Sequence, residues 1–506
     1  MQFQSRIADA LVEAGHEVHL LVYHMNPLVE CCDKLKSRAQ KIIHMERHES
    51  AKDAMMKLNV LKDSFSGKTN MIVEGSMTQW SYMLRDTCKD MLSNKNILDE
   101  LKAERYDVAI SEFYEVCIFG IFRQVGIKTK LASMAITLEN WAGSPFGIYG
   151  VSSYVTNLWA ASINGPKMTF LERFCNFYYD INIEYYINRL RFNLQQPLFY
   201  EAFGDDFPLL SDISRNFSLL FINSRPFYDL PRHISNKVVY IGGIVEPKPA
   251  GLTKDFEKVF EQAKDGVILL SFGTFANPDT MPYGIKQALV KVFATFPSYE
   301  FVWKFKPNEN DRTLFKSSSN LHMFDWVDQT AILAHPKTRA FVTHCGWNSL
   351  NEAARAGIPT VGIPLLGDQM YNAAVMKHKR VGVYVKVSEV VPTSGGVIID
   401  ALHKVLYNEE YRTNVRLVQQ KLRSEPFPAK ERLVKWVEFA AQFPDLNELN
   451  LPTVDDLGIL AYYSLDVIFV TTTVIILIVI CVIMLMRFLI RKIVALFSAK
   501  QKIKEH

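Results

Sequence analysis

Residues 341–372 of this chain read FVTHCGWNSLNEAARAGIPTVGIPLLGDQMYN, and this stretch contains the pattern that decides the fold. Phe341–Thr343 is a short apolar strand, and the His-Cys-Gly after it is typical of a turn out of a sheet. A helix is expected next, capped by Asn348 or Ser349 and ended by Gly357. A strand that turns directly into a helix predicts an α/β fold with a parallel sheet.

The N-terminus of this helix is a candidate phosphate site. Its first backbone N–H groups have no partner within the helix, and the helix dipole adds roughly half a positive charge, so a diphosphate fits there. His344, just before the helix, can reach the same phosphates. The second strand, Thr360–Ile363, leads to Asp368, Gln369 and Asn372 beyond its C-terminal end, where open parallel sheets bind ligands. Acid and amide side chains at that edge suit sugar hydroxyls.

Each of these features also has a purely structural interpretation. Ser349 and Glu352 can form a capping box, in which each side chain satisfies the other's backbone N–H group without any ligand. An Asp-Gln pair in a loop is often only a solvated turn. The combination of histidine, glycine turn, helix, strand and acid-amide loop within one short unit favours the functional interpretation.

This unit resembles the signature of the UDP-glycosyltransferases, the family that includes the UDP-glucuronosyltransferases. Upstream, Asp325–Gln329 and the following His335-Pro336 are similar to the family's Trp-x-Pro-Gln segment and its continuation, although Asp328 replaces the usual proline. Farther upstream, Ser271–Thr274 is similar to the family's first donor-domain phosphate loop. The resemblance extends over nearly the whole chain.

The resemblance implies a GT-B architecture, in which two facing Rossmann-like α/β domains bind the donor between them, with one C-terminal transmembrane helix added. A Pro- and Gly-rich segment, Glu246–Gly251, is the predicted linker between the two domains. The expected divisions are an acceptor-binding domain at 1–245, a UDP-sugar-binding domain with C-terminal helices at 246–445, a juxtamembrane segment at 446–466, a transmembrane helix at 467–486 and a basic cytosolic tail at 487–506.

Charge and cysteine content exclude several classes of protein. The formal net charge of +4 is small for 506 residues, which argues against a nucleic-acid-binding protein. The seven cysteines form no CxxC pair and have no metal-ligand spacing with histidine, so neither a zinc site nor a disulfide scaffold is predicted. Asn216-Phe-Ser is a glycosylation sequon, usable only if this region faces a secretory lumen.

One segment near the C-terminus has the properties of a membrane span. Val467–Met486 contains 20 uncharged, mostly apolar residues, enough to cross ~30 Å of hydrocarbon. Aspartates precede it and lysines and arginines follow it, so the positive-inside rule places the tail in the cytosol and the large N-terminal body in a lumen. Lys502 and Lys504 resemble a dilysine retrieval signal to the endoplasmic reticulum, although a basic tail can also bind anionic lipid.

The beginning of the chain departs from the family pattern. Met1–Arg6 has no apolar signal region, and a predicted helix, Phe3–Glu13, precedes the first predicted strand, His16–Tyr23, whereas a doubly wound fold begins on a strand. Family members carry a histidine in the turn before this helix, and it is their general base. Met1 falls immediately after that position, so the sequence resembles an N-terminally incomplete member that lacks the base.

An acid on a later strand loop orients that histidine in the family. Tyr106–Glu112 matches this loop, with Glu112 where many members have aspartate, and Glu115 is a less favoured substitute. Glu112 can also be read as an acid near a helix N-terminus without catalytic function. Three other histidines lie within or just after the first predicted strand and are interpreted as structural or exposed: His16, His19 and His24.

The resemblance implies transfer of glucuronic acid, or of glucose, from a UDP-sugar to a small lipophilic acceptor with inversion at the anomeric carbon. UDP-sugar is then a co-substrate, no metal or other cofactor is expected, and a homo-oligomer remains open. Trp326 would stack on uracil, Gln329 would bind the nucleoside and Glu352 the ribose, while Trp347 and Asn372 are weaker candidates. The complete set of expected donor-binding residues is Ser271, Gly273, Trp326, Gln329, His344, Gly346, Trp347, Asn348, Ser349, Glu352, Asp368 and Gln369.

Two other classes of protein compete with this interpretation. A non-catalytic UDP-sugar-binding membrane protein is the alternative, because the expected base histidine is absent from the chain. A nucleotide-dependent oxidoreductase is disfavoured, because no G-x-G-x-x-G turn joins the first strand to a helix. Aromatic stretches such as Phe170–Tyr179 are expected either in ordinary packing or in an apolar acceptor pocket.

Overall fold

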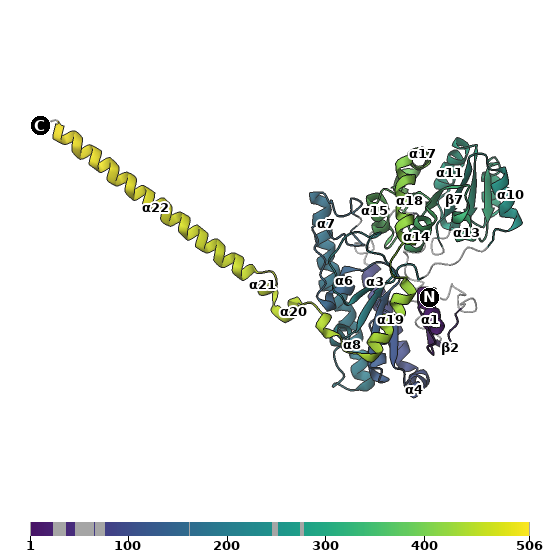
Figure 1. Ribbon diagram of the computed structural model, residues 1–506, viewed down its shortest axis with the longest axis horizontal. Helices are drawn as coiled ribbons and strands as arrows, with labels where there is room; N and C mark the ends of the chain where they lie inside the picture. The colour runs from purple at the N-terminus through teal and green to yellow at the C-terminus, as the bar shows by residue number, and fades with distance from the viewer. Residues whose placement is uncertain are drawn as a thin grey trace. The chain divides into compact units, whose positions relative to one another are not determined.

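The computed structural model describes residues 2–23, 37–45, 65, 76–160, 162–244, 251–273 and 278–504. The chain divides into two compact units, Met1–Asn450 and Leu451–His506, which are described separately (Figure 1). Residues 246–250 of the predicted linker, as well as His24 and Thr274, lie outside the described residues.

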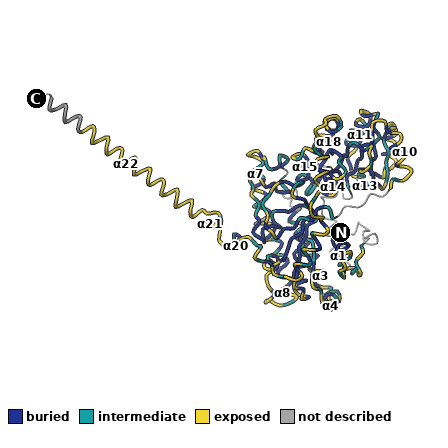
Figure 2. Tube along the Cα trace, in the orientation of Figure 1, coloured by how far each residue is buried: buried dark blue, intermediate teal, exposed yellow. Residues whose placement is uncertain are grey.

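The first half of the larger unit contains two parallel sheets. Four strands pair in the order β3-β4-β5-β6, and β1 pairs separately with β2. Every residue of β4 and β5 is buried, as expected for parallel strands covered on both faces. Figure 2 shows buried residues throughout the larger unit, whereas the described part of α22 is exposed. The strands are β1 (His19–Tyr23), β2 (Lys41–Met45), β3 (Val108–Glu112), β4 (Thr129–Met134), β5 (Leu219–Ile222) and β6 (Val238–Tyr240).

Helices cover this part of the chain, and a disulfide joins two of them. Cys88 on α3 is bonded to Cys117 at the start of α5, although the cysteine spacing predicted no disulfide. The described helical segments are α1 (Gln2–Glu13), α3 (Ser76–Ser93), α4 (Lys95–Glu104), α5 (Cys117–Gln124), α6 (Asn140–Gly143), η2 (Ser144–Phe146), α7 (Phe170–Ile181), the π-helical η3 (Asn182–Asn188), α8 (Arg189–Phe203) and α9 (Leu210–Arg215).

Helix α7 exposes an apolar stripe on one of its faces. Phe170, Phe174 and Phe177 are each more than half exposed, and Tyr178 is half exposed. Their spacing of three to four residues places them on one face of the helix. Ordinary core packing, one of the two roles expected for this aromatic stretch, does not describe these side chains.

The second half contains the predicted second parallel sheet, a six-stranded sheet in the order β12-β11-β10-β7-β8-β9. The two strands predicted in this half, Phe341–Thr343 and Thr360–Ile363, are confirmed with small changes of bounds. The strands are β7 (Gly266–Ser271), β8 (Tyr299–Lys304), β9 (Leu321–Phe324), β10 (Thr338–Thr343), β11 (Thr360–Gly362) and β12 (Gly382–Tyr384). The helical segments between and after them are α10 (Lys254–Gln262), η4 (Pro278–Thr280), α11 (Tyr283–Thr295), α12 (Glu309–Leu314), α13 (Gln329–Ala334), α14 (Trp347–Ala356), α15 (Gln369–His378), α16 (Val387–Val390), α17 (Gly396–Tyr407) and α18 (Glu409–Arg423).

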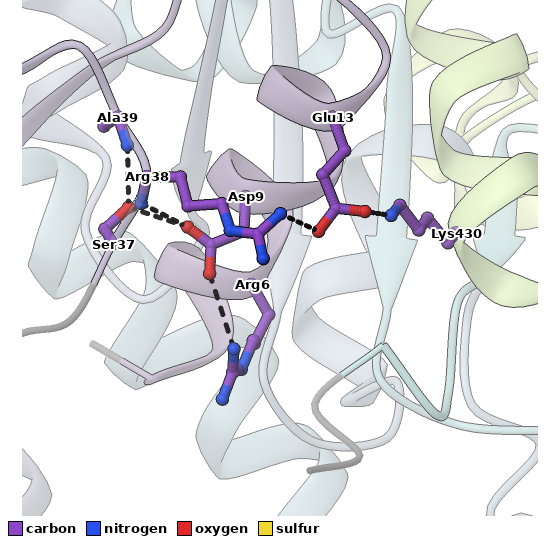
Figure 3. A network of polar contacts seen from close by, with 7 residues as sticks. All are labelled: Arg6, Asp9, Glu13, Ser37, Arg38, Ala39 and Lys430. Atoms are coloured by element: carbon purple, nitrogen blue, oxygen red, sulfur yellow. Dashed lines mark hydrogen bonds and ion pairs between the residues drawn. The ribbon is translucent and has the colours of Figure 1, made fainter. Parts of the chain in front are cut away.

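The last long helix of this unit, α19 (Ala429–Gln442), returns to the first half of the chain and packs on α1 (Figure 1). Leu433 and Val437 share a buried cluster with Ile7. Ion pairs supplement this contact, because Glu13 on α1 binds both Lys430 on α19 and Arg38 (Figure 3). Helix α19 therefore packs on the first domain although it follows the second in the sequence. The short η5 (Asn447–Leu449) comes after α19.

The smaller unit consists of helices α20 (Val454–Leu457), α21 (Ile459–Tyr462) and α22 (Leu465–Lys504). Helix α22 contains a 31-residue stretch, Leu465–Ala495, that is long and apolar enough to cross a membrane. The most apolar part of this stretch is not buried against other parts of the protein. The predicted span, 467–486, lies inside this stretch. The helix continues through most of the basic tail rather than ending at residue 486.

Candidate functional site

The centre of the site is the turn between β10 and α14. Gly346, not Asn348 or Ser349, is the N-cap of α14, and no side chain caps the helix. The predicted cap was therefore wrong by two or three residues, and both polar residues lie in the first turn instead. Cys345 adopts a left-handed backbone conformation with φ of 64°, which turns the chain sharply out of the strand. The helix N-terminus is thus left open for an anionic group.

His344 lies in a slot between two glycines. A Cβ on Gly273 would come within 2.6 Å of the imidazole, and a Cβ on Gly346 within 2.5 Å of its Nε2 atom. Burial lowers the pKa of His344 to about 4, opposed by a hydrogen bond with the backbone of Ser271, so the imidazole is neutral at pH 7. The neutral ring carries one N–H group, which it can donate either to the Ser271 carbonyl or, in the other tautomer, to a phosphate oxygen.

A second polar cluster joins α13 to the first turns of α14. The Gln329 amide donates to Ser349 Oγ at 3.2 Å and to Glu352 Oε2 at 2.7 Å. Ser349 and Glu352 thus share an outside partner, and with Gly346 as the N-cap they do not form the alternative capping box. Asp328, in place of the family's proline, caps α13 by accepting from Ala331 N at 2.8 Å. The substitution preserves a defined turn at this point.

Trp326 has the exposure expected of a stacking platform. Its side chain is 72% exposed, and the Lys304 ammonium lies 4.5 Å from the centroid of its ring. Lys304 ends β8 and was not among the predicted site residues. Its position at the C-terminal end of an apolar strand pattern, the edge at which parallel sheets bind ligands, is a signal that could have identified it.

The loop after β11 is held together by its own polar side chains. Gln369 Oε1 accepts from the backbone N–H groups of Leu365 and Leu366, at 2.8 and 3.0 Å. Asn372 donates to Asp368 Oδ2 at 2.6 Å and to Cys345 O at 2.9 Å, which ties this loop to the β10–α14 turn. Burial raises the pKa of Asp368 to about 6, and the negative charge of Glu139 contributes to the increase.

Two of the predicted donor residues, Ser271 and Trp347, are almost fully buried. Ser271 ends β7 and is 1% exposed, so it contributes to the edge of the sheet mainly through its backbone. Trp347 is 3% exposed; its indole N–H donates to the carbonyl of Asn223 and its ring packs on Tyr228. The structure thus places Trp347 in the packing between the two Rossmann-like halves.

Glu112 lies at the end of β3, beside the first turn of α1. Its Oε1 accepts from Ala135 N at 2.9 Å, and Gln4 on α1 donates a further hydrogen bond. Burial raises the pKa of Glu112, and these two hydrogen bonds oppose the increase. The acid is therefore next to the helix that the family's base histidine precedes.

The neighbouring acid and histidines have other partners. Glu115 accepts from Cys117 N at 2.9 Å at the start of α5, and burial raises the pKa of Glu115 to about 7. His16 lies 3.4 Å from Glu438, and His19 is 2.7 Å from the Tyr106 hydroxyl. The sequence predicted that both histidines are structural or exposed, and each has a partner of its own.

Comparison with known proteins identifies the family. The chain matches the family described as "UDP-glucoronosyl and UDP-glucosyl transferase" over residues 2–501. It is 29% identical to the Caenorhabditis elegans protein ugt-47, named as a UDP-glucuronosyltransferase, over 92% of this chain and 85% of that one. Human UDP-glucuronosyltransferase 2B10 is 27% identical over 91% of this chain and 86% of its own.

Solved structures share the fold. The structure of Phytolacca americana UGT2, complexed with UDP-2fluoro-glucose and pterostilbene, has a TM-score of 0.55 and 14% identity, covering 87% of this chain and 96% of that chain. This likeness confirms the expected GT-B architecture. The chain therefore belongs to the UDP-glucuronosyl and UDP-glucosyl transferase family and is a glycosyltransferase enzyme.

Proposed function

We propose that this enzyme transfers glucuronic acid or glucose from the UDP-sugar to a hydroxyl of a small lipophilic acceptor, with inversion at the anomeric carbon. One observation carries the proposal. The uncapped N-terminus of α14, the neutral His344 and the Gln329–Glu352 pair come together at the C-terminal edge of the second sheet.

Each part of a UDP-sugar has a chemically suitable partner at this edge. The diphosphate would accept from the first N–H groups of α14 and from His344. Uracil would stack on the exposed ring of Trp326, and Glu352 would accept from the ribose hydroxyls. Asp368 and Gln369 would bind the hydroxyls of the transferred sugar, while Asn372 holds the loop that carries them.

The chemistry follows from where charge develops. As the bond to the sugar breaks, negative charge grows on UDP, and donors already aimed at that position stabilise the transition state. We expect no metal ion in this step, because the helix N-terminus and His344 supply the donors. Attack by the acceptor from the opposite face inverts the anomeric centre. Glu112, at the end of β3, would orient the histidine that family members carry before α1, and this histidine would take the acceptor's proton.

We also propose that the enzyme is a single-pass protein of the endoplasmic reticulum membrane, with its body in the lumen and its tail in the cytosol. The apolar stretch Leu465–Ala495 and the basic residues that follow the predicted span support this orientation. The Cys88–Cys117 disulfide suits the oxidising conditions of the lumen.

The proposal is tested with the full chain in detergent, supplied with UDP-glucuronate or UDP-glucose and with 1-naphthol as the acceptor. Conjugate should form with one of the two donors. His344→Ala should fold normally but reduce kcat by roughly 10²- to 10³-fold, the effect of removing one preorganised donor. Unchanged turnover in this variant would contradict the assignment. UDP binding without any product would instead favour the non-catalytic UDP-sugar-binding protein.

A further inference from the structure

Asn223 uses its backbone and side chain to contact both Rossmann-like halves. It directly follows β5 and is 3% exposed. Its backbone N–H donates to Met134 O at 2.9 Å, and its carbonyl accepts from the Trp347 indole on α14. Its amide nitrogen donates to Ala135 O at 2.8 Å and to Asn348 Oδ1 at 3.2 Å. One short side chain thus joins the loop after β4 to the first turn of α14.

The partners of Asn223 belong to the two groups that must meet in the reaction. On one side, Ala135 receives the Asn223 amide at its carbonyl and donates its own N–H to Glu112, the proposed base-orienting acid. On the other side, Trp347 and Asn348 are the first two residues of the diphosphate-binding helix. A continuous chain of hydrogen bonds therefore runs from the acceptor-activating loop to the donor helix.

We propose that Asn223 is a positioning residue for glycosyl transfer, which fixes the acceptor-activating loop at a set distance from the diphosphate-binding helix. This inference rests on the proposed function, because it assigns Glu112 and α14 to opposite sides of one reaction. Asn223 contacts neither substrate in this role; it acts through Ala135 and Asn348.

The reaction makes this distance important. Acceptor oxygen and anomeric carbon must approach to about 3–3.5 Å in line, and a misplacement of about 1 Å can cost ~10²-fold in rate. The acceptor-activating groups lie on the β3-β4-β5-β6 sheet, and the donor-binding groups lie on the six-stranded sheet. A buried side chain with few rotatable bonds, held from both sides, sets the separation with little freedom.

A separate contact keeps the two halves together when Asn223 is changed. The carboxylate of Asp229 accepts from the Tyr371 hydroxyl on α15 at 2.6 Å, from Ser224 Oγ at 2.7 Å and from Leu230 N at 2.7 Å. None of these bonds involves Asn223. Asn223→Ala keeps the two backbone bonds of residue 223 and removes only the bonds of its amide to Ala135 and Asn348, so it should release the alignment without separating the domains.

Asn320 supplies a matched control. It is another buried asparagine, and its amide donates to the carbonyls of Phe293, Phe296 and Tyr299 at 3.0–3.1 Å. All of these residues lie within the second half, away from the chain of bonds through Asn223. Asn320→Ala thus reproduces the loss of a buried amide without affecting the bridge.

The test compares full-length wild type, Asn223→Ala and Asn320→Ala in detergent. In Asn223→Ala we expect kcat to fall at least about tenfold while the Kd for UDP changes by less than about twofold, which is the signature of lost alignment rather than lost binding. Asn320→Ala should lose thermal stability but keep its kcat. An Asn223→Ala variant whose kcat follows only its loss of folded protein would overturn the proposal.

Hydrogen exchange gives a readout that does not need turnover. In wild type, UDP should slow amide exchange both in residues 347–356 and in residues 129–135. In Asn223→Ala, UDP should slow exchange in residues 347–356 only. The proposed role of Asn223 would be refuted, and the proposed function left intact, if UDP still protects residues 129–135 in the variant. The same holds if wild type binds UDP but shows no protection of residues 129–135. A wild type that binds no UDP would refute the proposed function and the bridge with it. If Asn223→Ala does not accumulate, Asn223→Asp removes both donated bonds at constant volume and is scored the same way.

Discussion

Gly346→Ala offers a sharp test of the slot around His344. The backbone of Gly346 has φ of −58° and ψ of 137°, a conformation that alanine adopts without strain. The added methyl group would lie 2.5 Å from His344 Nε2 and 2.9 Å from its Cε1 atom, whereas ordinary contacts begin at 3.4 Å. The imidazole must therefore withdraw by about 0.9 Å, the difference between 3.4 and 2.5 Å.

A displacement of that size at a reacting centre lowers the rate by about 10²-fold, which corresponds to about 2.7 kcal/mol in the activation free energy. Crowding in the slot should also cost about 1–3 kcal/mol of folding stability. If His344 is already alanine, the added methyl group meets no ring. The double variant should then be no slower than His344→Ala alone, so the two effects should be strongly non-additive.

The assay is sugar transfer by the four proteins of this cycle, with folded fractions measured by thermal melting. Gly396→Ala is the control, because a Cβ there meets only Thr393 at 3.5 Å or beyond. The reasoning is refuted if Gly346→Ala keeps most of its activity. It is equally refuted if the glycine substitution slows the enzyme as much without the imidazole as with it.

Three further outcomes are expected. Trp326→Ala should weaken UDP binding by about 1–3 kcal/mol with an unchanged melting temperature, because the ring is exposed, and calorimetry that shows equal affinity would exclude stacking. Cys88→Ser should lower stability by about 3 kcal/mol, because it opens the loop to Cys117, and thiol titration of both cysteines in wild type would contradict this. The pKa of His344 is about 4 in the folded protein and 6.5 in the unfolded chain, so the unfolded chain takes up the imidazole proton first as the pH falls. The difference in unfolding free energy between wild type and His344→Gln should therefore stay constant above pH 6.5. It should fall by up to about 3 kcal/mol as the pH decreases towards 4, because wild type loses stability there. A difference that does not change with pH would exclude a neutral, buried imidazole.

Local patterns predicted the elements of the donor half well. Strand β10, the end of α14 at Gly357 and the loop at Asp368 all follow from short-range signals, which determine helix stops and strand runs. The N-cap was misplaced because the Ser349–Glu352 pattern fits a capping box. The amide of Gln329, from a different helix, binds both side chains instead. A tertiary contact of this kind leaves no trace in the spacing of the motif itself.

Other features depend on distant parts of the chain meeting. Cys88 and Cys117 are 29 residues apart in no recognised motif, and the arrangement of α3 and α5 decides that they bond. Asn223 ends a plain apolar strand, and its importance depends on Trp347 and Asn348, over a hundred residues later. The aromatic residues of α7 were singled out from the sequence, but their exposure was not predicted. Composition alone could not distinguish a buried from an exposed helical face.

The Cys88–Cys117 bond also bears on how this enzyme should be produced. The closed loop contains β3 and therefore Glu112, five residues before its second cysteine. Bacterial cytosol keeps thiols reduced, so recombinant material made there would carry the acid on an open loop. Production in a secretory host, or with an oxidising refolding step, yields the covalently closed form. Catalytic comparisons among variants are meaningful only between preparations in which this bond has formed.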